Sequence, residues 1–169
     1  SGNFMLPFPP VIDSTILVAF RSCEQKGAYA HGHNLAIDGT SLDLHFGGAI
    51  AAGMEVTRKA FYLMGKSASE SVALGINAAC DFWGTYIGPS DKAKSWDTLI
   101  LAFDGYFKQW PLETDPLRPA FGGKGIEFSF AVPIPEVLRP DGQGPVIYGG
   151  RFDMIGELEG MMLGVDEKT

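Results

Sequence analysis

The sequence predicts an α+β fold in which N-terminal helices precede a mainly antiparallel β-sheet. Between Ser14 and Trp110 the apolar residues recur every three to four positions, which is the period of amphipathic helices. From Gly125 onward the period changes to two, as expected for strands. Near the end, Glu159-Gly160 separates two runs with β character and is a short turn signal. The chain therefore divides into a helical first part and a sheet that closes with a hairpin.

Composition limits the class of protein. The 169 residues are 46% hydrophobic and 20% charged, typical of one globular domain. Cys23 and Cys80 are too few for a disulfide framework and favour a reducing compartment, so we expect a cytoplasmic protein. No apolar run reaches the length of a membrane span. The net charge of −7 argues against a general nucleic-acid-binding surface, although a local basic patch or a bound metal would still serve.

Four helices are expected before the sheet, and each has a start or stop signal. Small residues in the first half of the helix at 46–64 would let another backbone approach closely. The aromatic stripe of the helix that ends at Pro111 is interpreted as core rather than as a base-stacking face. The helices span 14–27 (N-cap Ser14, C′ Gly27), 46–64, 67–86 (capping box Ser67 and Glu70) and a segment capped by Ser90 or Asp91 that ends at Pro111.

The strands follow an irregular segment, 112–124. In the first strand Ile126 and Phe128 occupy one face, so Glu127 points to the other, and Pro133 and Pro135 end the strand. A loop over 140–145 leads to a hairpin formed by 146–158 and 161–168. The motif at 30–33, which contains two histidines, is interpreted as a solvated loop rather than a metal site because no third ligand is near.

The predicted hairpin contains the candidate catalytic residues. With Glu159-Gly160 as a two-residue loop, Asp153 faces Asp166 and Arg151 faces Lys168. Two opposed carboxylates repel each other, and a divalent cation such as Mg²⁺ offsets that repulsion. A lysine beside such a site can hold a phosphate or orient a water. The geometry therefore indicates a metal-dependent phosphodiester hydrolase.

Two other interpretations of the hairpin remain open. The same residues on a surface hairpin can form an ordinary solvated edge. A G1 bulge at Gly160 would shift the register by one residue and change the faces.

The same residues resemble a known family. Gly150-Arg-Phe-Asp153 followed by Val165-Asp-Glu-Lys-Thr169 resembles the G-x-x-D … (D/E)-x-K core of the PD-(D/E)xK nucleases, and most closely their RecB-like exonuclease branch, which includes phage-encoded members. Three earlier segments resemble further motifs of that branch in the same order. They are the S-x-L-x-x-F-x-x-C helix at 14–23, the G-x-x-x-H-x-x-L-E helix at 45–55 and the E-x-x-F strand at 125–130.

This resemblance implies a single nuclease-like domain over 1–169 with an α/β restriction-endonuclease-like core. It implies DNA as substrate, recombination or replication proteins as partners, and a host cytoplasm for a phage-encoded member. Asp153 and Asp166 would bind Mg²⁺ or Mn²⁺ with help from Glu127, and Lys168 would complete the catalytic set. The family continues past this motif with a helix, so we expect the chain to lack the C-terminal part of the domain.

The sequence departs from the family in two respects. The position of the family's metal-binding histidine is Ala51, and two cysteines cannot supply the four ligands of the iron–sulfur cluster that some members carry, so no such cluster is expected. The departure at Ala51 leaves a second hypothesis, a catalytically inactive module that binds nucleic acid or a protein partner. A third hypothesis is a structural protein without a site, in which Asp153 and Lys168 form an exposed ion pair.

Overall fold

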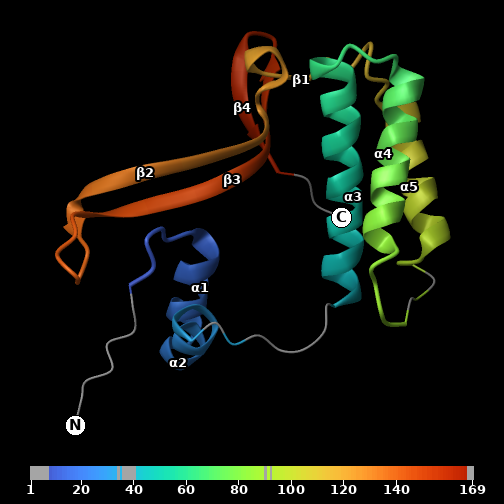
Figure 1. Cartoon of the computed structure of the whole chain (residues 1–169). Helices are drawn as coiled ribbons and strands as arrows, with labels where there is room; N and C mark the ends of the chain where they lie inside the picture. The colour runs from blue at the N-terminus through green and yellow to red at the C-terminus, as the bar shows by residue number, and fades with distance from the viewer. Residues whose placement is uncertain (1–7, 34, 36–40, 90, 92, 167–169) are drawn as a thin grey trace. The chain divides into compact units, whose positions relative to one another are not determined.

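The computed structural model describes residues 8–33, 35, 41–89, 91 and 93–166. It has the predicted α+β class, with helices that precede an antiparallel four-stranded sheet (Figure 1). The chain forms two compact units. The first unit comprises 1–38 and 129–151, and the second comprises 39–128 and 152–169.

The helical start of the first unit differs from the prediction of one helix over 14–27. It consists of α1 (Ser14–Ser22), α2 (Glu24–Gly27) and a π-helical turn over Ala28–Gly32 that replaces the predicted loop. Cys23 separates the helices because its backbone is extended (φ −166°, ψ 115°), and its thiol is exposed. Asp13, not Ser14, is the N-cap: its carboxylate accepts a hydrogen bond from the Ile16 N–H at 2.8 Å.

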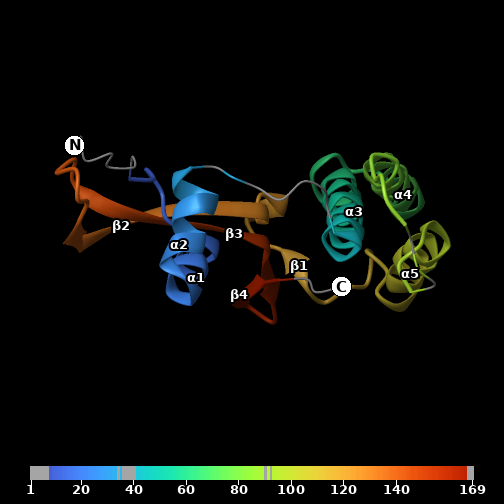
Figure 2. The ribbon, with the colours of Figure 1, turned by 90° about the horizontal axis from the view of Figure 1, so that it is seen from below.

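The second unit begins with three helices that lie side by side (Figure 2). They are α3 (Leu42–Arg58), continued by a π-helical turn (Lys59–Leu63), α4 (Ala68–Trp83) and α5 (Trp96–Gln109). The predicted capping box of Ser67 and Glu70 is confirmed, and its hydrogen bonds lower the pKa of the Glu70 carboxyl.

The N-cap of α5 corrects a prediction. Ser95 caps this helix and forms a capping box with Thr98. Asp91 lies before the helix, and its carboxylate accepts hydrogen bonds from the Ala93 and Lys94 N–H groups at 2.9 and 2.6 Å, so it closes a turn instead. Ser90, the other predicted cap, lies outside the described residues.

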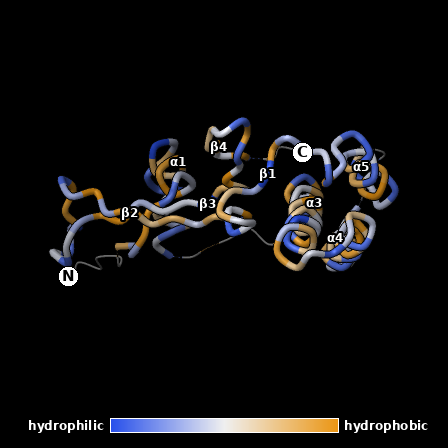
Figure 3. Tube along the Cα trace, turned by 90° about the horizontal axis from the view of Figure 1, so that it is seen from above, coloured by the Kyte–Doolittle hydropathy of each residue, from blue (hydrophilic) through white to orange (hydrophobic). Residues whose placement is uncertain are grey.

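Helices α3 and α4 approach each other closely, as the small residues of α3 predicted. A Cβ atom built on Gly75 would lie 2.7 Å from the Gly53 carbonyl oxygen and 1.8 Å from the Thr57 Oγ1. Along α5 the predicted aromatic stripe is buried at Phe103 and Phe107, while Trp96 and Trp110 at its ends are exposed. Figure 3 shows apolar and hydrophilic residues alternating along these helices, as expected of amphipathic segments.

The sheet contains two long strands and two short ones. Strand β3 (Pro145–Leu158) pairs with β1 (Arg118–Pro119), β2 (Ile126–Leu138) and β4 (Met161–Val165). Strand β1 and a 3₁₀ turn over Phe121–Gly123 form within the segment that was predicted to be irregular. Strand β2 does not end at Pro133 as predicted, because it is an edge strand, where a residue without an N–H donor is tolerated.

Candidate metal-binding hairpin

The hairpin of β3 and β4 has the predicted register. Met154 pairs with Val165 and Leu158 pairs with Met161. The two connecting residues, Glu159 and Gly160, both have positive φ, 51° and 80°, as a tight two-residue hairpin turn requires. The alternative register with a G1 bulge is therefore not adopted.

The last pair of the hairpin is Met154–Val165; Asp153 precedes Met154 on β3, and Asp166 directly follows the end of β4. Met154 is 1% exposed and points into the protein, so Asp153, its neighbour on the strand, points to the opposite face. Asp153 is half-buried and Asp166 is exposed. Lys168, the third predicted catalytic residue, lies outside the described residues, and so does its expected pairing with Arg151.

The third predicted carboxylate comes from the neighbouring strand. The Ile155 N–H of β3 donates to the Gly125 carbonyl oxygen at 2.8 Å. Glu127 follows Gly125 by two residues in β2, and Asp153 precedes Ile155 by two residues in β3, the strand that pairs with β2. Glu127 is half-buried and has φ +53°, a left-handed conformation that is costly for a residue with a Cβ and recurs at functional sites.

The donor set suits a hard divalent cation. Mg²⁺ is commonly bound by one or two carboxylates together with several waters, which is what Asp153 and Asp166 offer. Within the described ranges no group of three or more His, Cys, Asp or Glu side chains is arranged to hold a metal ion. Glu127 would therefore act through a water rather than as a direct third ligand.

The histidines are placed against aromatic rings. His31 and His33 lie near the rings of Phe20 and Tyr29, at centroid distances of 6.5 and 6.0 Å. His45 begins the family-like segment in α3 but is 6% exposed, with Nε2 3.3 Å from the Trp83 carbonyl oxygen. It is a core residue of the helical bundle.

Two other residues of the family-like helix lie on the surface of α3. Ala51, at the position of the family's histidine, is exposed. Glu55 forms an ion pair with Lys59 one turn further along the same helix, so its carboxylate has a structural partner.

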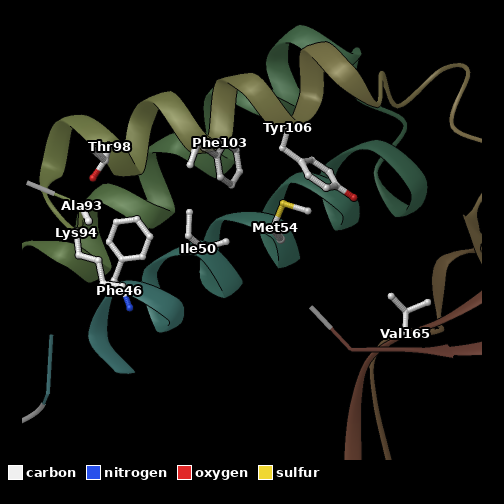
Figure 4. A pocket seen from close by; sticks show the side chains of 10 residues that line it. Phe46, Ile50, Met54, Ala93, Lys94, Thr98, Phe103, Tyr106 and Val165 are labelled. Atoms are coloured by element: carbon white, nitrogen blue, oxygen red, sulfur yellow. The ribbon is translucent and has the colours of Figure 1, made fainter. Parts of the chain in front are cut away.

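One feature near the hairpin was not predicted from the sequence. A cavity of about 660 Å³ opens between α3 and α5, with Val165 of β4 on its far side (Figure 4). The apolar spacing of Ile50 and Met54 was visible in the sequence, but the cavity depends on how two helices pack. Its lining residues are Phe46, Ile50, Met54, Ala93, Lys94, Thr98, Ala102, Phe103, Tyr106 and Val165.

The polar groups of this cavity, hereafter the α3–α5 cavity, lie toward its ends. The Lys94 ammonium pairs with the Asp43 carboxylate at 2.6 Å. The Tyr106 hydroxyl accepts a hydrogen bond from the Arg58 guanidinium at 3.3 Å, and Arg58 is 6% exposed. Burial also raises the pKa of the nearby Tyr62 hydroxyl.

Comparisons with protein-family models, curated proteins and solved structures give no match to this chain. Among the described residues, no helix combines the length and apolar character needed to span a membrane.

Proposed function

We propose that the protein is a metal-dependent DNA nuclease of the RecB-like PD-(D/E)xK type. The observation that carries this proposal is the hairpin register, whose last pair, Met154–Val165, is flanked by Asp153 on β3 and by Asp166 just past β4. Carboxylates close to each other on a hairpin are the oxygen ligands that a hard divalent cation takes. The order of the family-like motifs along the chain supports the same assignment.

In this proposal each residue has a separate role. Asp153 and Asp166 would hold Mg²⁺ or Mn²⁺ through carboxylate oxygens, and Glu127 on β2 would orient a water beside them. The bound cation supplies a water of lowered pKa and neutralises the scissile phosphate. Lys168 would position the attacking water and stabilise the charge that develops on the phosphate. The exposed side of Asp166 leaves room for a large substrate.

The test is hydrolysis of end-labelled DNA with Mn²⁺ by the parent and by Asp153→Asn. We expect the variant to lose at least about a hundredfold in rate, because the neutral amide cannot replace a charged ligand. Calorimetric titration with Mn²⁺ should show binding by the parent and not by the variant. Glu157→Gln is the matched control, since Glu157 is an exposed carboxylate elsewhere on β3. Equal rates for the parent and Asp153→Asn would contradict the proposal.

Ala51 favours one alternative, a catalytically inactive module that binds nucleic acid or a protein of a recombination or replication complex. An exposed alanine at the position of the family's histidine removes one metal ligand. This alternative predicts DNA binding without hydrolysis in Mn²⁺, and no effect of Lys168→Ala on either. The free thiols of Cys23 and Cys80 are in keeping with the reducing, cytoplasmic compartment in which such a protein would work.

A further inference from the structure

We propose that the α3–α5 cavity binds an unpaired nucleobase of single-stranded DNA beside the metal hairpin. This inference rests on the proposed function, because it assigns the strand type that the hairpin would cleave. The cavity residues on α5 lie outside the family-like motifs. The inference also has a separate readout, which is DNA affinity rather than hydrolysis.

The shape and lining of the cavity suit an aromatic base. A volume of about 660 Å³ lies within the usual range for small-ligand pockets. Phe46 and Phe103, which are 7% and 1% exposed, form a fixed apolar floor. Tyr106 is half-buried, so part of its ring remains accessible from the cavity (Figure 4). A base that stacks on such a ring gains affinity without regard to its sequence.

The charges at the cavity are complementary to a nucleotide. The chain as a whole carries a net charge of −7, yet among its described residues no carboxylate lines the cavity, and Lys94 does. The Asp43 side chain that pairs with Lys94 is 77% exposed, so a DNA phosphate can compete for the ammonium. At the other end the Arg58 guanidinium holds the Tyr106 hydroxyl. An apolar space with cations toward both ends matches an apolar base on an anionic backbone.

The position of the cavity connects it to the hairpin. Val165 lines the cavity, and the next residue is Asp166, one of the two proposed metal ligands. A strand with a base in the cavity would therefore carry its backbone past the carboxylates. In a duplex the base would first have to leave the stack, which is unfavourable. The geometry thus favours single-stranded DNA.

The experiment measures fluorescence anisotropy of a labelled oligo-dT strand and of a blunt duplex, with Ca²⁺ in place of Mn²⁺. We expect Tyr106→Ala to weaken binding of oligo-dT roughly tenfold, because base–aromatic stacking is lost. Tyr106→Phe keeps the ring and should stay within about twofold of the parent. Duplex binding should change little in either variant. Circular dichroism confirms that each variant is folded.

Trp96→Ala is the matched control, since Trp96 is a 43% exposed aromatic residue of the same helix that does not line the cavity. Equal loss in Trp96→Ala and Tyr106→Ala, or no loss in Tyr106→Ala, would overturn the assignment of the cavity. No binding of oligo-dT by the parent would overturn it as well. In each of these cases the Mn²⁺-dependent hydrolysis and its loss in Asp153→Asn judge the proposed function independently.

Discussion

Two glutamates, Glu127 in β2 and Glu159 in the β3–β4 turn, have left-handed backbone conformations. Only one of these conformations is required by a turn. Glu159 (φ 51°) occupies the hairpin turn, where the turn geometry demands a positive φ. Glu127 (φ 53°) lies within β2, where no turn demands it. A left-handed residue with a Cβ costs about 1–2 kcal/mol. Strain of this kind at a proposed metal-site carboxylate is consistent with a conformation held for function.

At this scale we expect Glu127→Gly to raise the free energy of unfolding by about 1 kcal/mol, because glycine adopts a positive φ without a Cβ clash. The same variant should lower the rate of Mn²⁺-dependent hydrolysis, since it removes the carboxylate. Urea unfolding and the labelled-DNA assay measure the two effects. Glu159→Gly should give a similar gain in stability with no change in hydrolysis. A less stable Glu127→Gly protein would show that the side-chain interactions of Glu127 outweigh the strain of its backbone.

At the scale of the element, the contact between α3 and α4 depends on glycine. A Cβ atom added at Gly75 would meet backbone and a buried hydroxyl of α3, and neither can move as a flexible side chain would. That hydroxyl, Thr57 Oγ1, is buried and has no hydrogen-bond partner within the described part of the chain. The helices are therefore packed as closely as two backbones permit, and added volume cannot be absorbed locally.

We expect Gly75→Ala to lower the free energy of unfolding by about 1–3 kcal/mol through overpacking. Gly105→Ala on α5 is the control, because nothing described lies within 4 Å of its added Cβ. That change should raise the free energy of unfolding by roughly 0.5–1 kcal/mol through the better helix propensity of alanine. Thermal or urea unfolding measures both. A neutral Gly75→Ala would mean that the α3–α4 distance relaxes freely.

At the scale of the whole molecule, the buried core is unevenly divided. The two hydrophobic clusters, built around Leu99 and Phe103, both lie in the second unit. In the first unit the buried residues among those described are Gly27, Val146 and Gly149, and α1 buries none of its residues. Local unfolding should therefore be much easier in α1 than in α3, α4 and α5.

Hydrogen exchange followed by mass spectrometry tests this expectation. Amides of α3, α4 and α5 should exchange at least roughly tenfold more slowly than those of α1 and α2, because opening the former exposes the clustered core. The long strand β3 contributes to both units, so its two ends serve as an internal comparison. Equal protection of α1 and α3 would contradict the uneven division of the core.

The sequence was most informative where structure depends on neighbours in the chain. The α+β class, the Ser67–Glu70 capping box and the hairpin register around Glu159-Gly160 were all predicted, because periodicity, caps and tight turns are local. Predictions failed where a competing local partner was close. Asp13 rather than Ser14 caps α1, and Ser95 rather than Asp91 caps α5. Cys23 interrupts a helix whose apolar spacing looked continuous.

The sequence by itself determined the register from Met154–Val165 to Leu158–Met161, since a two-residue turn fixes which residues face each other across a hairpin. Only the tertiary structure decided that Glu127 on β2 has a strained backbone, and that β2 continues through its prolines as an edge strand. The α3–α5 cavity likewise exists only once two helices and the end of β4 are brought together. Such features arise from packing between segments far apart in the chain, which no local pattern encodes.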